Sequence, residues 1–135
     1  MIEGSCCCGE VRFRLTEPPS MMGTCHCSRC RKVGASVFVF VRKETLEWIS
    51  GRDSVATFVA QPPYKFARSF CRTCGTALGE ILSDGDSFPI AANTLDGDPG
   101  VRNRFHEFVS ELPAWAVIGD DGKQFLGHPV PTSPA

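Results

Sequence analysis

The sequence lacks a long hydrophobic run and an excess of charge of either sign. Its 135 residues include 14 basic and 15 acidic side chains, for a formal net charge of -1. Such a balance does not favour nucleic acid or a membrane surface as the main partner. No segment reaches the length of a membrane span, and the N-terminus has no basic region followed by an apolar run. We therefore expect a cytoplasmic protein that binds neither nucleic acid nor membrane.

The sequence also has no internal repeat and no sustained helical periodicity. Residues 9–15 instead alternate between polar and apolar side chains, as in a half-buried strand. Short β-rich runs separated by turn residues predict a mainly β, single domain over residues 1–127. Residues 128–135 contain three prolines, and we expect a loose C-terminal tail. The other predicted strands cover residues 36–41, 54–59, 65–70, 76–82, 87–92, 105–109 and 115–118.

Cysteine, by contrast, is abundant, with eight residues in the chain. A reducing cytoplasm keeps thiols free, so this many cysteines are more typical of metal ligands than of a disulfide framework. The spacing within each of three groups is typical of zinc ligands. The groups are Cys6, Cys7 and Cys8; Cys25, Cys27 and Cys30; and Cys71 and Cys74.

Cys71 and Cys74 form a Cys-x-x-Cys-Gly zinc knuckle, in which the glycine relieves a backbone conformation with positive φ. A closed structural site needs four ligands, and Cys6 with Cys8 completes it best because their Cys-x-Cys-Gly has a similar form. The alternative is a disulfide between Cys71 and Cys74, which a reducing compartment disfavours. Cys7 is left over, and we expect it to be a buried or idle thiol.

The remaining cysteines, Cys25, Cys27 and Cys30, can converge on one metal without help from a distant segment. Three ligands leave a fourth position open, as in catalytic or ligand-exchanging zinc sites. His26 lies between the first two ligands, and we expect its side chain to point away from the metal and to pack against the protein or contact solvent. The alternative is that another side chain closes the site, for which the candidates are His26, His106 and Cys7.

The number of thiolates limits the chemistry of this second site. Three anionic sulfurs make zinc a weaker Lewis acid than three imidazoles do, so water activation is not its obvious use. An electron-rich zinc is better suited to hold a fourth thiolate and to lower the pKa of that thiol. The sequence thus predicts a small thiol as ligand. The neighbouring basic turn of Arg29, Arg31 and Lys32 either receives the carboxylates of such a thiol or is simply solvated.

Four segments together suggest a family. Residues 4–13 read Gly-Ser-Cys-Cys-Cys-Gly-Glu-Val-Arg-Phe, residues 25–32 Cys-His-Cys-Ser-Arg-Cys-Arg-Lys, residues 70–78 Phe-Cys-Arg-Thr-Cys-Gly-Thr-Ala-Leu, and residues 106–115 form the last. In these motifs the chain resembles the glutathione-dependent formaldehyde-activating enzyme family, which includes the vertebrate centromere protein V. The resemblance implies a β-tent fold, with a structural zinc held by the first and third segments and a catalytic zinc held by the second.

The resemblance also implies an activity. We expect a zinc-dependent carbon–sulfur lyase, similar to S-(hydroxymethyl)glutathione synthase, that adds glutathione or another small thiol to formaldehyde or another small aldehyde. Two Zn²⁺ ions per chain follow, one on Cys25, Cys27 and Cys30 and one on Cys6, Cys8, Cys71 and Cys74. The candidate substrate contacts are Arg31, Lys32 and Trp115.

Two positions in the last segment have simpler explanations than a role in the pocket. Core packing is the simpler expectation for Trp115, and surface exposure is the simpler one for His106. This region also departs from the family pattern, since Pro113-Ala114-Trp115 stands where Ala-Pro-Trp is usual and a polar stretch at 120–123 replaces an apolar one. These departures affect the substrate rather than the metal ligands.

Other functions compete with this enzyme. A non-catalytic glutathione or zinc carrier is the main alternative, because no clear general acid or base lies near the second cysteine group. A nucleic-acid module would need a basic domain and an array of stacking aromatic side chains, which the sequence lacks. A methionine-R-sulfoxide reductase would need a catalytic cysteine on a late strand, and no cysteine follows Cys74.

Overall fold

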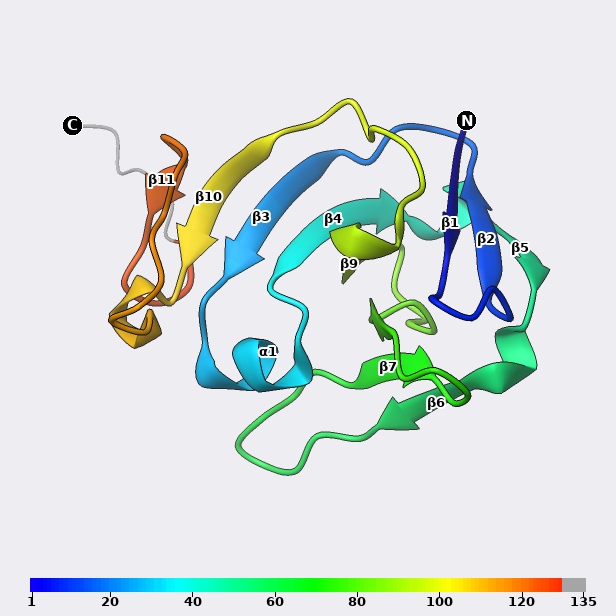
Figure 1. Ribbon diagram of the computed structural model, residues 1–135, viewed down its shortest axis with the longest axis horizontal. Coiled ribbons are helices and arrows are strands. Elements are labelled where there is room, and N and C mark those ends of the chain that lie inside the picture. The colour runs from blue at the N-terminus through cyan, green and yellow to red at the C-terminus, as the bar shows by residue number, and fades with distance from the viewer. Residues whose placement is uncertain (130–135) are drawn as a thin grey trace.

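A computed structural model describes residues 1–129 of the chain, which form a mainly β domain with three sheets (Figure 1). The largest sheet has five strands in the order β11-β10-β3-β4-β9. Strands β3, β4 and β9 are antiparallel to their neighbours in this group, whereas β10 runs parallel to both β3 and β11. The bounds are β3 Met21–Cys25, β4 Val37–Arg42, β9 Ser87–Ala91, β10 Asn103–Glu107 and β11 Lys123–Gln124.

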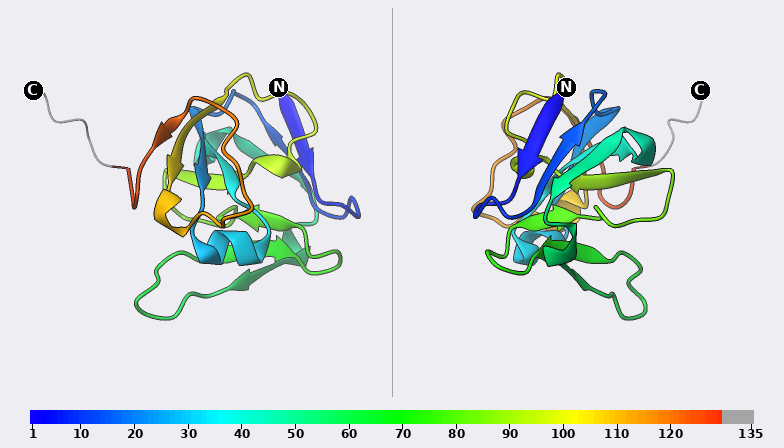
Figure 2. Two further views of the ribbon diagram at one scale, coloured as in Figure 1. Left: turned by 60° about the vertical axis from the view of Figure 1, so that its left-hand side comes forward. Right: turned by 90° about the vertical axis from the view of Figure 1, so that its right-hand side faces the viewer.

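Two smaller antiparallel sheets flank the large one, with strand orders β1-β2-β5 and β6-β7-β8. The short helix α1 connects β3 to β4 and lies between the large sheet and the β6–β7 hairpin (Figures 1 and 2). The strands are β1 Ile2–Ser5, β2 Arg12–Leu15, β5 Leu46–Ser50, β6 Val55–Phe58, β7 Arg68–Cys71 and β8 Ala77–Gly79. The helices are α1 Ser28–Val33 and the 3-10 turns η1 Lys43–Thr45, η2 Arg52–Ser54, η3 Ala92–Thr94 and η4 Val109–Glu111.

The core forms where the sheets face one another. The predicted alternation in residues 9–15 is confirmed, since Val11, Phe13 and Leu15 are fully buried while the residues between them face outward. Apolar side chains from β4, β8 and β9 pack against them. Burial of these side chains is the main favourable contribution to folding. The cluster also includes Cys6 and Cys71, so two of the four cysteines predicted to hold the structural zinc are part of the core.

The expected fold class is confirmed at the level of a mainly β single domain, and most predicted strands have a counterpart. The strand predicted at 115–118 is wrong. Its segment forms a turn, and Trp115 and Val117 are 78% and 90% exposed, so it has no core partner that would hold it in a sheet. The described residues also include β1, β3, β5 and β11, which the strand predictions missed.

The structure describes only the beginning of the predicted C-terminal tail. The proposed tail 128–135 falls largely on residues 130–135, which lie outside the described residues. Its first residue, His128, lies 3.5 Å from Glu107 and edge-on to Phe108. Within residues 1–129, no helix has the length and apolar character needed to cross a membrane.

Gly4 on β1 marks a position where the sheet has no room for a side chain. A Cβ atom there would lie 2.3 Å from the ring of Phe13, which is fully buried and cannot move aside. We expect Gly4→Ala to lower the free energy of unfolding by about 1–3 kcal/mol, as overpacked cores do. Urea unfolding measures it. Gly97→Ala is the control, because no atom lies within 4 Å of its added Cβ; equal losses in both variants would contradict the account.

Candidate metal centre and its surroundings

The structure brings the four predicted structural ligands together. The sulfur atoms of Cys6, Cys8, Cys71 and Cys74 all lie within 4.8 Å of one another. The Cys6–Cys8 and Cys8–Cys71 sulfur pairs are 3.5 and 3.9 Å apart. A regular tetrahedron with zinc–sulfur bonds of about 2.3 Å has sulfur atoms about 3.8 Å apart. The donor set and its spacing therefore fit a closed zinc site, and the disulfide alternative is absent because all eight cysteines are free.

Both halves of this set use the same local turn. Gly9 and Gly75 follow the second cysteine of each pair with φ of 80° and 79°, which confirms the expected positive-φ glycines. The backbone N–H of Val11 donates to the sulfur of Cys6 at 3.2 Å, a bond that stabilises a thiolate. The hydrogen bonds from the hydroxyl and backbone of Thr76 lower the pKa of Cys74 to about 5. The turns are thus prepared to hold anionic sulfurs.

Cys7 lies between the two ligands of the first turn. Its side chain is exposed, so of the two expected states, buried or idle, burial is wrong. Its backbone N–H donates to the Thr76 hydroxyl at 2.9 Å, which joins the N-terminal turn to the second turn. The position therefore helps to connect the two turns through its main chain.

The second predicted set also converges. The sulfur atoms of Cys25, Cys27 and Cys30 all lie within 4.8 Å of one another. Cys25 ends β3, and Cys27 is the N-cap of α1, where its sulfur accepts from the backbone N–H of Cys30 at 3.3 Å. The helix ends one turn later at Gly34, whose φ of 87° closes it. A single strand–helix junction therefore positions all three ligands, without a distant segment.

No fourth ligand joins this set within residues 1–129. His26 turns away, and its Nε2 lies 2.8 Å from Nδ1 of His106. Burial and the nearby His106 lower the pKa of His26, with Asp120 opposing them. Cys7 contacts Thr76 at the other cysteine set instead. The two histidines are therefore engaged with each other and Cys7 lies at the other cysteine set, so the arrangement suits a metal with one exchangeable position.

Arg68, which the sequence analysis missed, lies beside the second set. Its Nη1 donates to the sulfur of Cys30 at 3.5 Å, and its Nε is buried without a hydrogen-bond partner. A hydrogen bond from Cys25 and the guanidinium of Arg68 lower the pKa of Cys30 to about 6, against the effect of burial. The pKa of Cys25 is raised, because it shares a hydrogen bond with Cys30 and is buried. Of these two thiols, Cys30 therefore ionises more readily than Cys25.

A pocket of about 200 Å³ opens next to this guanidinium. Arg68 forms its charged wall, and the remaining lining is mostly apolar, from Val33 on α1 and from Phe58, Phe70 and Ala77 on the hairpin strands. The adjoining loop 59–67 extends from the end of that hairpin (Figure 2). Tyr64 of the loop lies 3.7 Å beneath the guanidinium of Arg29, which connects the loop to α1. The pocket therefore combines one cation with an apolar lining.

The predicted substrate contacts have mixed positions. Arg31 and Lys32 are exposed on α1, and Trp115 is exposed rather than packed in the core, so the core expectation is wrong. The expected exposure of His106 is also wrong, since it is only 4% exposed. Its burial is possible because Asp120 and His26 each lie 2.8 Å from one of its two ring nitrogens. Polar partners from distant segments therefore account for the buried position of His106.

The amino-acid sequence is similar to those of known proteins. Residues 1–111 match the family model described as glutathione-dependent formaldehyde-activating enzyme. A Halomonas elongata protein whose name places it provisionally in this family is 30% identical over 142 residues, covering 96% of this chain and 89% of that protein. An uncharacterised lyase of Schizosaccharomyces pombe is 27% identical over 84 residues, or 62% of this chain and 59% of that protein.

A solved structure has a similar fold. The crystal structure of a Rhodobacter sphaeroides protein has a TM-score of 0.58 and 25% identity, covering 71% of this chain and 89% of that chain. The family model includes every cysteine of both sets and most of the strands. Because this match spans most of the chain, the protein belongs to the glutathione-dependent formaldehyde-activating enzyme family.

Proposed function

We propose that this protein is a zinc-dependent carbon–sulfur lyase that binds glutathione or a similar small thiol at the three-cysteine site and adds it to formaldehyde or another small aldehyde. The observation that carries the proposal is the convergence of Cys25, Cys27 and Cys30 with no fourth ligand among residues 1–129. The proposal includes a β-tent fold, one zinc ion in each cysteine set, and a cytoplasmic location that keeps the thiols reduced.

Zinc at this site would supply a position where a thiol is held as its thiolate at neutral pH. The chain's own residues then orient the reactants. Arg68 presents a guanidinium that can donate to a carboxylate of glutathione or to the aldehyde oxygen as that oxygen gains negative charge. The apolar side chains of Val33, Phe58 and Phe70 line the pocket beside this guanidinium, where an apolar part of the bound thiol can pack.

The addition itself is balanced without a further reactant. The thiol sulfur forms a bond to the carbonyl carbon, and the π electron pair of the carbonyl moves to oxygen. The proton that leaves the thiol is replaced by one on that oxygen, so the product is an S-hydroxymethyl adduct. Because the thiolate is already ionised, positioning contributes more to the rate than acid–base catalysis does. Arg31, Lys32 and Trp115 remain proposed contacts for the outer part of the thiol.

The rate of adduct formation tests the proposal. Formation of S-(hydroxymethyl)glutathione is followed by exchange NMR for the wild type, Cys27→Ser and Cys7→Ser. We expect the wild type and Cys7→Ser to accelerate the reaction and Cys27→Ser to lose the acceleration. The reason is that Cys27 belongs to the three-cysteine set, whereas Cys7 does not. Equal rates in wild type and Cys27→Ser would contradict the proposal.

A non-catalytic glutathione or zinc carrier is the second candidate. Within residues 1–129, the sulfurs of the three cysteines hydrogen-bond to one another, to the backbone and to Arg68, and none of these bonds involves a carboxylate that could act as a general acid or base. A carrier would bind glutathione in a calorimetric titration without accelerating adduct formation. That combination of results would favour the carrier over the enzyme.

A further inference from the structure

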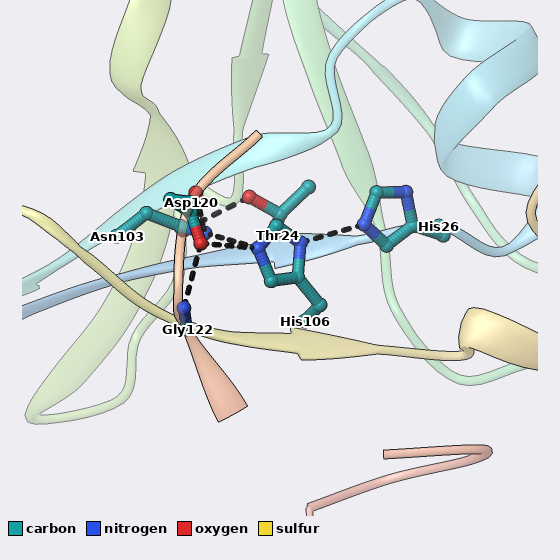
Figure 3. A network of polar contacts seen from close by, with 6 residues as sticks. All are labelled: Thr24, His26, Asn103, His106, Asp120 and Gly122. Atoms are coloured by element: carbon teal, nitrogen blue, oxygen red, sulfur yellow. Dashed lines mark hydrogen bonds and ion pairs between the residues drawn. The ribbon is translucent and has the colours of Figure 1, made fainter. Parts of the chain in front are cut away.

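A chain of hydrogen bonds runs from the turn before β11 to the second cysteine set (Figure 3). Oδ1 of Asp120 lies 2.8 Å from Nε2 of His106, and Nδ1 of His106 lies 2.8 Å from Nε2 of His26. Asn103 supports the turn, with its amide nitrogen 3.2 Å from Oδ2 of Asp120 and its amide oxygen accepting from Thr24 at 2.9 Å. The chain ends at His26, the residue between Cys25 and Cys27.

The carboxylate at one end fixes where each proton lies. An ionised carboxylate only accepts hydrogen bonds, and donation from His106 and from the backbone N–H of Gly122 lowers the pKa of Asp120. Nε2 of His106 therefore carries a proton, since without one its lone pair would face Oδ1 of Asp120 at 2.8 Å. The amide nitrogen of Asn103 also lies 2.9 Å from this Nε2, and it donates to Oδ2 of Asp120, so both nitrogens face the same carboxylate. Nδ1 of a neutral His106 is then an acceptor, so Nε2 of His26 must donate to it. Nδ1 of a neutral His26 is left without a proton.

The chain holds the backbone as well as the ring of His26. The backbone N–H of His26 donates to the carbonyl of Glu107 at 2.9 Å, and Glu107 is paired with Cys25 where β10 runs parallel to β3. His106 is buried, so its partners cannot be exchanged for water without a cost. Both the main chain and the side chain of His26 are therefore attached to β10, and Figure 3 shows the second ring nitrogen on the side away from His106.

We propose that Asp120 and His106 are positioning residues of the three-cysteine site, which hold His26 in one orientation with Nδ1 as an unprotonated hydrogen-bond acceptor. Fixing the ring of His26 also fixes the peptides that connect Cys25 and Cys27, and with them two of the three sulfurs. Partners that orient a ligand in this way support metal affinity. The inference rests on the proposed function only in that this cysteine set holds zinc. Asp120 lies beyond residues 1–111, so the family match does not include it.

Asp120→Ala tests the inference, with Asp121→Ala as the matched control one residue away. Without the carboxylate, the polar group left beside Nε2 of His106 is the amide nitrogen of Asn103 at 2.9 Å, which can only donate. The proton of His106 then moves to Nδ1 and is donated to His26, and the proton of His26 moves to its own Nδ1. Long-range proton–nitrogen NMR of the imidazoles distinguishes the two tautomers directly. We expect Nδ1 of His26 to be pyridine-like in the wild type and Asp121→Ala, and pyrrole-like or mixed in Asp120→Ala.

Zinc release to a chelator gives a second measurement that needs no substrate. The phase that is missing in Cys27→Ser belongs to the three-cysteine set. We expect Asp120→Ala to weaken zinc binding in that phase by about tenfold, the lower end of the range for residues that orient metal ligands, and Asp121→Ala to leave it unchanged.

Two results would overturn the inference. One is a wild-type spectrum in which Nδ1 of His26 carries the proton, which needs no variant to fold. The other is an Asp120→Ala protein with an unchanged tautomer and unchanged zinc release. Neither measurement uses glutathione or formaldehyde, so a failure of thiol addition would leave this inference standing, and its own failure would leave the thiol reaction to be judged separately.

Discussion

Cys71→Ser is expected to remove cooperative folding of most of the domain. Its sulfur is fully buried in the core and is part of the set that connects the N-terminal turn to the end of β7. Structural zinc contributes about 10–16 kcal/mol of apparent binding free energy in small zinc domains, whereas a whole domain is stable by only about 5–15 kcal/mol. Loss of one ligand should therefore lower the zinc affinity enough to unfold the chain. Thermal melts followed by circular dichroism measure this effect.

Cys7→Ser is the matched control, because Cys7 is a neighbouring thiol outside both sets. Its melting temperature should stay close to that of the wild type. A strong chelator added to the wild type should reproduce the behaviour of Cys71→Ser. A Cys71→Ser protein that melts like the Cys7→Ser control, with or without chelator, would show that the four-cysteine set does not stabilise the fold.

Arg68→Met is expected to weaken both glutathione binding and adduct formation by about 10–100-fold. Hydrogen bonds to charged groups contribute about 1.5–3 kcal/mol, and about 1.4 kcal/mol corresponds to a factor of ten in binding. Arg68 is suited to this role because its guanidinium contacts Cys30 and lines the pocket, while its Nε has no hydrogen-bond partner in the described part of the chain. Calorimetric titration with glutathione measures the loss, and zinc content is measured in parallel.

Three other basic residues serve as controls for Arg68. Arg72→Met removes an exposed guanidinium on the four-cysteine turn and should have little effect. Arg31→Met and Lys32→Met test the substrate contacts that the sequence suggested, and we expect a smaller loss from each because both are exposed. An Arg68→Met protein with full zinc content and wild-type glutathione affinity would exclude the guanidinium from the binding site.

The metal sets were the most predictable part of the molecule. Ligand spacing within Cys25, Cys27 and Cys30 is local, so one strand–helix junction is enough to bring their sulfurs together. The pairing of the two outer cysteine turns was also accessible, since a closed zinc site needs four ligands and the two turns have similar sequences. Strands with strict alternation, such as residues 9–15, were recognised for the same reason: a local pattern determines their faces.

The surroundings of the second set were not predictable, because they depend on contacts between distant segments. Arg68 is 38 residues from Cys30 in sequence, and nothing in its neighbourhood marks it as a partner of a thiol. His106 was expected on the surface, but its ring is buried because it has a polar partner in Asp120. That partner is 14 residues further along the chain, so the local sequence does not reveal it. Trp115 shows the opposite error. An aromatic side chain suggests packing in the core, but this one lies on an exposed turn.

The most direct test of the account is zinc content by elemental analysis of the wild type and Cys27→Ser, together with calorimetric titration with glutathione. The account predicts two zinc ions per wild-type chain and one in the variant, with glutathione binding lost when the second zinc is lost. One zinc ion in both proteins and no binding of glutathione by either would contradict it, and would leave a β domain held together by a single structural metal site.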